Sequence, residues 1–197
     1  MTRIHRALLV IGAAVGASAL IPPAPASADT ITKHAHALFQ SAESRVSMAV
    51  DVTKRGDGST TIDVEWTDYE CAEANGAYVC NHVFRNSHDV PVRRFSFSLT
   101  GATVSASLPY QEIRRTCRIL EEQETCTEEY DVGETTIQAT WTPNTEPTRS
   151  TRIDENGRTV VTTSVVTALT GTAYGLSYGG PSSVGWLTKV RTIDPTA

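Results

Sequence analysis

The fold is decided by the stretch Cys71-Ala72-Glu73-Ala74-Asn75-Gly76-Ala77-Tyr78-Val79-Cys80. Asn-Gly is the strongest short signal for a β-hairpin, because both central residues of a type I′ turn need positive φ. Counting outward from the turn places Cys71 opposite Cys80 in a non-hydrogen-bonded pair, where Cα atoms are roughly 4.5 Å apart. That distance allows a disulfide. The stretch therefore predicts antiparallel β structure and an oxidising compartment.

A second pair of cysteines repeats the spacing. Cys117 and Cys126 enclose eight residues, as Cys71 and Cys80 do. We therefore expect two local disulfides, which is one of the three connectivities that four cysteines allow. A zinc site built from the four is the alternative, but the cysteines of a zinc-binding pair are usually only two to four residues apart.

The beginning of the chain has the pattern of a secretory signal peptide. Arg3 and Arg6 precede the apolar run Ala7–Ile21, and small residues follow at Ala26-Ser27-Ala28. The run has 15 residues, fewer than the roughly 20 that a membrane-spanning helix needs, so an uncleaved anchor is the lesser reading. We expect residues 1–28 to be removed, and residues 29–197 to form a single all-β domain that is secreted.

Charge limits the class of partner. Residues 1–28 contain two arginines and no acid, so their removal changes the net charge from −5 to −7. An acidic domain lacks the basic face that nucleic acids and anionic membranes require, so we expect neither as a partner. We also expect a monomer that carries no cofactor.

Apolar residues alternate with polar ones on both sides of a three-residue loop, Gly56-Asp57-Gly58. A loop with an odd number of residues is required if the apolar residues at even-numbered positions before and after it are to face one core. Gly58 falls where a type I turn with a G1 bulge needs a left-handed residue. The pairs predicted across this loop are Val52 with Ile62, Val50 with Val64 and Met48 with Trp66.

Two further turns are predicted from the positions of glycines and from whether the apolar residues on each side have odd or even numbers. Gly101-Ala102 predicts a two-residue type II′ turn, and Asn156-Gly157 predicts another hairpin. The opposite pairs predicted by these turns are Leu99 with Val104, Phe97 with Ala106, Phe95 with Leu108, Glu155 with Arg158 and Ile153 with Val160.

The complete pattern favours an all-β fold. Asp68 and Glu70 fall in the inward row of Trp66, which predicts a bulge or a hairpin that projects beyond the sheet. A helix is expected only at Ala35–Ser44. Elsewhere, short alternating runs between Gly, Asn and Pro predict an antiparallel β-sandwich, or a partly open barrel, of about ten to twelve short strands with two hairpin disulfides.

Recognition of an extracellular protein, glycan or small ligand is the function that the residue pattern favours. Aromatic side chains on adaptable or exposed segments are suited to such contacts, although ordinary core packing is the alternative for each of them. One set shares the hairpin face of the first disulfide: Tyr69, Tyr78, His82 and Phe84. The other set lies among glycines and serines: Tyr174, Tyr178 and Trp186.

Two other functions remain open. An extracellular hydrolase would use two carboxylates roughly 5 to 9.5 Å apart in a cleft, and such pairs can be drawn at Asp68 with Glu70 or at Glu128 with Asp131. A protease inhibitor would present Arg118 on a rigid convex loop. No catalytic residue is assigned, because the sequence contains neither a nucleophile elbow nor a metalloprotease, phosphate-binding or dinucleotide motif.

Metal binding has two weaker candidates. His34 and His36 would project to one side of a strand, but no third ligand is identifiable and the segment lies near the expected mature N-terminus. Carboxylates cluster around Cys126, without the spacing and turn glycine of a calcium loop. We expect no metal site, and we interpret the acidic hairpin as a solvated edge of the sheet.

The first cysteine hairpin, Cys71 to Cys80, in an acidic exported β domain resembles the apoproteins that carry enediyne chromophores. The resemblance covers this hairpin alone, since the second cysteine loop is longer than that of the apoproteins and the mature chain is larger than theirs. It implies carriage of a small ligand as one form of recognition.

Overall fold

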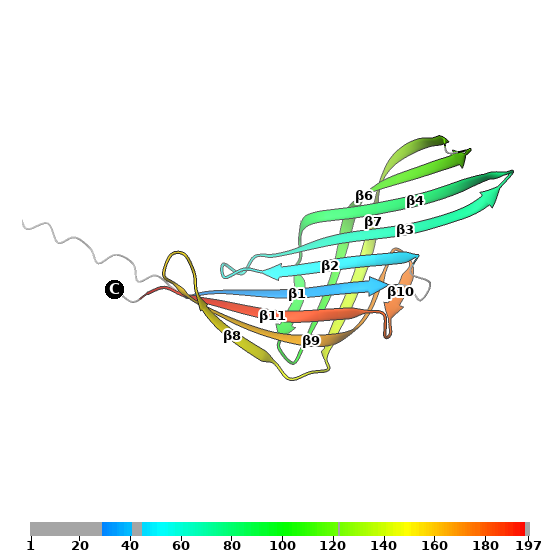
Figure 1. The fold of residues 1–197 in the computed structure, drawn as a ribbon. Coiled ribbons are helices and arrows are strands. Elements are labelled where there is room, and N and C mark those ends of the chain that lie inside the picture. The colour runs from blue at the N-terminus through cyan, green and yellow to red at the C-terminus, as the bar shows by residue number, and fades with distance from the viewer. Residues whose placement is uncertain (1–28, 41–44, 122, 196–197) are drawn as a thin grey trace, which may run out of the picture.

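A computed structural model describes residues 29–40, 45–121 and 123–195. They form eleven strands and no helix (Figure 1). The strands are β1 Thr30–Gln40, β2 Val46–Lys54, β3 Thr60–Ala74, β4 Ala77–Pro91, β5 Arg94–Ser98, β6 Gly101–Leu120, β7 Gln123–Pro143, β8 Thr148–Ile153, β9 Thr159–Ala173, β10 Leu176–Gly179 and β11 Val184–Ile193. The signal peptide expected at 1–28 lies outside the described residues. The described part of the chain contains no helix that is long and apolar enough to cross a membrane.

All the strand pairings are antiparallel, which confirms the predicted fold class. The pairings also close on themselves. Eight strands form a ring in the order β1, β2, β3, β4, β6, β7, β9, β11, and β11 pairs with β1. The other three pair with ring strands only, β5 with β6 and both β8 and β10 with β9.

The interior of the ring is filled by the inward rows of its strands. Alternate residues of each strand point inward, as the pleat requires. The largest fully buried side chains include Phe39, Met48, Ile62, Leu108, Ile137, Trp141 and Leu187, which come from six of the eight ring strands. This apolar interior is the main source of stability, since burying each such side chain is worth roughly 1.5 to 3 kcal/mol.

The Asn75-Gly76 hairpin and both disulfides are confirmed. Asn75 and Gly76 have φ values of 52° and 73°, and Cys71 pairs with Cys80 at a Cα separation of 4.0 Å. Cys117 and Cys126 are likewise joined, with Cα atoms 4.1 Å apart. Because Cys80 also pairs with Cys117 in the sheet, the two disulfides are neighbours.

The predicted loop at Gly56-Asp57-Gly58 is also confirmed. Gly58 has a φ of 87°, and the three pairs predicted between β2 and β3 are observed. Asp57 accepts hydrogen bonds from the backbone N–H (2.8 Å) and hydroxyl (2.7 Å) of Ser59, which fix the loop.

The predicted pairing around Gly101-Ala102 is wrong. The turn residues are Leu99 and Thr100, so that Phe97 pairs with Ala102 and Phe95 with Val104. The two registers differ by four residues, an even shift that leaves every side chain on the same face, so the apolar pattern could not choose between them. The Ser98 side chain favours the observed turn by accepting the N–H of Thr100 at 3.0 Å.

The pairing predicted across Asn156-Gly157 is wrong by one residue. Ile153 pairs with Thr159, and the predicted Glu155 to Arg158 contact does not form. Asp154 organises this loop instead, because its carboxylate accepts hydrogen bonds from the backbone N–H groups of Asn156 and Arg158. It also pairs with the Arg158 guanidinium at 2.8 Å.

The helix expected at Ala35–Ser44 is wrong over the residues that the structure describes there. Residues 35–40 belong to β1, which pairs with β2 and with β11. Ala35, Ala37 and Phe39 are buried at strand spacing, a period of two that the sequence already contained. Residues 41–44 lie outside the described residues.

The predicted projecting hairpin is confirmed. β3 pairs with β2 only as far as Asp68, and β7 pairs with β9 only from Gln138 onward. Residues 69–82, 114–121 and 123–130, here called the arm, therefore extend past the ring as a four-stranded continuation of β3, β4, β6 and β7 (Figure 1). Both disulfides lie in the arm.

Candidate functional site

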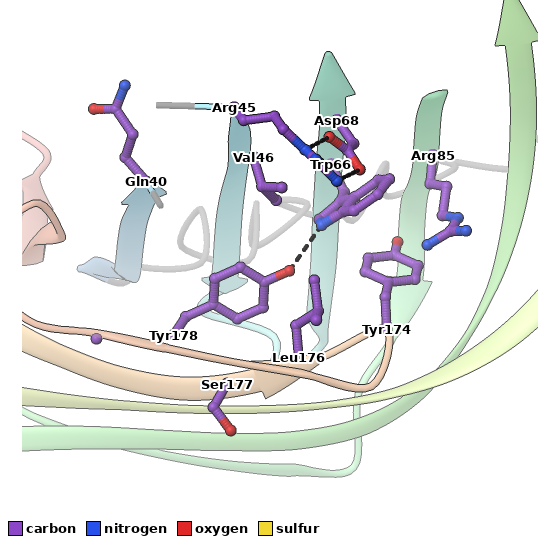
Figure 2. Close-up of a pocket in the computed structure, with 11 residues that line it drawn as sticks. Gln40, Arg45, Val46, Trp66, Asp68, Arg85, Tyr174, Leu176, Ser177 and Tyr178 are labelled. Atoms are coloured by element: carbon purple, nitrogen blue, oxygen red, sulfur yellow. Dashed lines mark hydrogen bonds and ion pairs between the residues drawn. The ribbon is translucent and has the colours of Figure 1, made fainter. Parts of the chain in front are cut away.

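A pocket of about 690 Å³ opens at the end of the ring from which the arm projects. Its walls come from segments far apart in the sequence. Gln40 and Val46 lie at the end of β1 and the start of β2, Trp66 and Asp68 on β3, and Arg85 on β4 (Figure 2). The β9–β10 turn and β10 supply Tyr174 and residues 176–179.

Three aromatic side chains line one side of the pocket. The indole N–H of Trp66 donates to the hydroxyl of Tyr178 at 2.7 Å. The Trp66 ring also lies 5.4 Å from the ring of Tyr174, centroid to centroid. Tyr178 in turn lies 5.5 Å from the buried ring of Phe39. The aromatic wall is therefore packed on the apolar interior of the ring.

Arg85 faces this aromatic wall. It is paired with Trp66 across the β3–β4 hairpin, and its guanidinium lies 4.4 Å from the Trp66 ring centroid. The rings of Tyr174 and Tyr110 lie 5.1 Å and 5.5 Å from the same guanidinium. Such cation–π contacts are worth roughly 0.5 to 2 kcal/mol each, with the larger values where water is excluded. Arg85 is thus held in place by three rings.

Glu112 holds the other side of Arg85. Its side chain is 3% exposed, and its two oxygens accept hydrogen bonds from Nε of Arg85 and Nε of Arg114. Burial alone would raise the carboxyl pKa, but the hydrogen bonds from Arg114 and Arg85 outweigh it, so the pKa of Glu112 is lowered. Glu112 therefore stays ionised behind the pocket wall.

Tyr174 occupies a strained position between β9 and β10. Its φ is 52°, and its backbone N–H donates to the Thr135 hydroxyl at 3.1 Å. Burial raises the pKa of its phenol to about 12. The hydroxyl is buried without a hydrogen bond among the described residues, and the nearby Ser87 hydroxyl donates to the carbonyl of Pro109.

The charged side chains at the rim of the pocket form ion pairs with one another. Arg45 donates to the carboxylate of Asp68 at 2.8 Å and 3.3 Å, and it lies 3.0 Å from Glu70. Asp68 and Glu70, one carboxylate pair considered for a hydrolase, thus share a guanidinium. The other pair, Glu128 and Asp131, is exposed on β7 and does not line this pocket. No contact among these four carboxylates supports hydrolase activity, which therefore stays a prediction.

The structure brings some sequence candidates together and separates others. Tyr174 and Tyr178 both line the pocket, but Trp186 lies on β11, where its ring is 5.2 Å from that of His36. The hairpin aromatics lie on the face of β3 and β4 opposite to Trp66. They are Tyr69 and Tyr78, which are exposed, and His82 and Phe84, which are half-buried.

The two histidines of β1 have protein partners. His34 Nδ1 lies 3.1 Å from the Thr53 hydroxyl, and His36 Nδ1 lies 2.6 Å from the carboxylate of Asp51. Burial lowers the pKa of His34, whereas the hydrogen bond that His36 donates to Asp51 raises the pKa of His36. A compact cluster of potential metal ligands among the described residues contains Cys117, Glu124 and Cys126, but its two cysteines are joined in a disulfide.

Arg118 does not lie on a convex loop. It is exposed, but it belongs to β6 and pairs with Val79 on one side and Thr125 on the other. The geometry that a protease inhibitor would need is therefore not found at this arginine.

Sequence reasoning missed Trp66, Arg85 and Glu112 as site residues. A signal for the first two was present, because counting outward from Asn75-Gly76 places Arg85 directly opposite an inward tryptophan. Glu112 follows Leu108 in an inward row of β6, where a carboxylate is unexpected. An ionisable residue in an apolar row is thus the pattern that indicates this site.

Comparisons of the chain with protein-family models, with curated proteins and with solved structures found no match.

Proposed function

We propose that the protein acts outside the cell by noncovalent binding of a small organic ligand in the pocket of Trp66, Arg85, Tyr174 and Tyr178. The observation that carries the proposal is the aromatic wall, whose rings lie 5.3 to 5.5 Å from their neighbours and border an open space of about 690 Å³. That volume lies within the range of small-molecule sites, roughly 300 to 1,000 Å³.

The chemistry of the lining supports a small ligand over a macromolecule. Val46 and Leu176 extend the apolar wall, while Gln40 and Ser177 and the charged groups of Arg45, Asp68 and Arg85 supply the polar part of the lining. A concave site in which an aromatic and aliphatic wall meets convergent polar groups is typical of small-molecule recognition. The two disulfides fit an extracellular location.

Nuclear magnetic resonance of the three tryptophan indole N–H groups tests the proposal. Titration with 2-naphthamide, a neutral flat probe, should shift the Trp66 signal and saturate. The Trp141 signal should stay fixed, because that indole is buried in the core and donates to the carbonyl of His36 at 2.8 Å.

Two tyrosine variants localise the binding. Tyr178→Ala should weaken binding of 2-naphthamide by about tenfold, since an aromatic contact is worth roughly 0.5 to 1.5 kcal/mol beyond its buried area. Tyr69→Ala removes an exposed tyrosine of the arm and should leave binding unchanged. The proposal fails if the Trp66 signal does not move, or if both variants weaken binding equally.

A further inference from the structure

We infer that the ligand of this pocket is an organic anion, with a flat apolar body and a carboxylate that binds the terminal nitrogens of Arg85. The inference rests on the proposed function and names the class of ligand. The carrying observation is that a fixed guanidinium at the aromatic wall retains unused donors.

The hydrogen bonding of Arg85 leaves its outer edge free. A guanidinium has five N–H donors, and Arg85 uses Nε on Glu112. Its terminal nitrogens have no acceptor among the residues that the structure describes, and 19% of the side chain remains accessible. These donors reach the solvent, so a ligand that supplies acceptors can take the place of water at them.

The shape of the guanidinium selects a carboxylate. Its terminal N–H groups form a planar fork that matches the two oxygens of a carboxylate, which gives a short, charge-assisted pair. Arg85 is already oriented by Glu112 and by the rings of Trp66, Tyr110 and Tyr174. Little conformational freedom would therefore be lost when the anion binds.

The second cation of the pocket is committed elsewhere. Arg45 is held by Asp68 and Glu70 at the rim, so Arg85 is the arginine with donors to offer at the wall. In Figure 2 the Arg45 side chain is joined to Asp68, whereas the Arg85 guanidinium lies beside Tyr174. We therefore expect an anionic ligand to place its charge at the end of the pocket where Arg85 lies.

The same geometry disfavours a cationic ligand beside Arg85. Aromatic walls attract ammonium groups through the faces of their rings. Here the faces of Trp66 and Tyr174 are already occupied by the Arg85 guanidinium, at 4.4 Å and 5.1 Å. A second cation at this wall would be repelled by the first.

The hydroxyl of Tyr178 offers one more donor. It accepts the indole N–H of Trp66, so its own proton remains available. A flat apolar body seated between Val46 and Leu176 would lie beside this hydroxyl. An oxygen substituent on that body is therefore compatible with the site.

The test compares 2-naphthoate with the uncharged 2-naphthamide by isothermal titration calorimetry. The wild-type protein should bind the acid about tenfold tighter than the amide, or more, because a hydrogen-bonded charge contributes at least that factor. Equal affinities would overturn the inference but leave the proposed pocket intact. Failure of both probes to bind would overturn the pocket as well.

Two arginine variants test whether Arg85 causes the preference for the acid over the amide. Arg85→Gln should reduce the acid-to-amide ratio to about one, because it should weaken binding of the acid at least tenfold more than binding of the amide. Arg114→Gln is the matched control, because it removes the other arginine of Glu112 and does not line the pocket. It should keep the wild-type ratio. An unchanged ratio in Arg85→Gln, with thermal unfolding that shows a folded protein, would overturn the inference, as would loss of the ratio in Arg114→Gln.

Discussion

Glu112 shows, at the scale of single residues, how an ionised group is accommodated in the wall of an apolar ring. A carboxylate that is 3% exposed loses its hydration, which costs several kcal/mol unless hydrogen bonds replace the water. Arg85 and Arg114 supply those bonds, one to each oxygen. Glu112 is thereby kept ionised, and Arg85 is kept at the aromatic wall.

Replacement of this carboxylate should therefore be costly. We expect Glu112→Gln to lower the free energy of unfolding by about 3 kcal/mol, since removal of one partner from a buried ion pair leaves a charge uncompensated. Urea denaturation monitored by circular dichroism measures the change. Glu128→Gln is the control: its ion pair with Arg115 is exposed and 3.9 Å long, so the loss should stay below about 0.5 kcal/mol. Equal losses in the two variants would contradict this role for Glu112.

Acid should remove the contribution of Glu112 to stability. Its pKa is lower in the folded protein than the ordinary value of 4.5, so the folded state binds its proton less readily than the unfolded chain does. The stabilisation is complete above pH 4.5 and is lost as the pH falls through the folded pKa. Urea denaturation at neutral and acidic pH should show the gap between wild type and Glu112→Gln shrinking with acid. A gap that stays constant would contradict the assignment.

The sequence could predict part of the site at this scale. The pairing of Trp66 with Arg85 follows from a local turn, as each step outward from Asn75-Gly76 is fixed by strand geometry. The partnership of Arg85 with Glu112 could not be predicted in the same way. It depends on the β4–β6 register, for which no short connecting turn exists.

At the scale of elements the Asn75-Gly76 hairpin was predictable, whereas the register beside Asn156-Gly157 was wrong by one residue because Asp154 organises that loop. Asn75-Gly76 fixes its own register because both of its residues adopt positive φ. The turn beside Gly101 was not predictable, since pairing Phe97 with Ala102 or with Ala106 leaves the same side chains inward. Local chemistry therefore decides a register, and hydrophobic parity alone does not.

The disulfides should stabilise the arm more than the ring. We expect replacement of both Cys71 and Cys80 by Ala to speed amide hydrogen exchange in residues 69–82 by up to about a hundredfold. The ten-residue loop that they close is worth about 2.7 kcal/mol on the chain-entropy estimate. Exchange at Val50 and Val64, which are buried inside the ring, should be unchanged. Mass spectrometry of the exchanging protein measures both regions, and equal acceleration in the ring would show that the arm is not a separate cooperative unit.

Closure of the ring organises the whole molecule. β7 completes it by pairing with the second half of β9, and Tyr174 and Tyr178 follow directly after that half. Trp66 and Tyr178 then meet although they are 112 residues apart in the sequence. A pocket assembled by closure has no local signature, which is why sequence reasoning found Tyr174 and Tyr178 but not their partners on β3 and β4.

Gly171 allows the close approach of β9 to β7 that completes the ring. A Cβ at Gly171 would lie 2.6 Å from the backbone carbonyl oxygen of Gln138, on the strand that closes the ring. Because a backbone atom cannot move aside cheaply, Gly171→Ala should lower the free energy of unfolding by about 1 to 3 kcal/mol. It should also weaken binding of 2-naphthamide. Thr170→Ala, an exposed neighbour, should change neither property, and urea denaturation with calorimetry measures both. A Gly171→Ala protein of wild-type stability would contradict the tight approach of β7 to β9.

A crystal structure of the protein with 2-naphthoate tests the central claim most directly. The account predicts a closed ring in which β7 pairs with β9, with the naphthalene against Trp66 and Tyr178 and the carboxylate within hydrogen-bond distance of the terminal nitrogens of Arg85. A ring that is open between these strands, or a naphthoate bound away from Arg85, would contradict it.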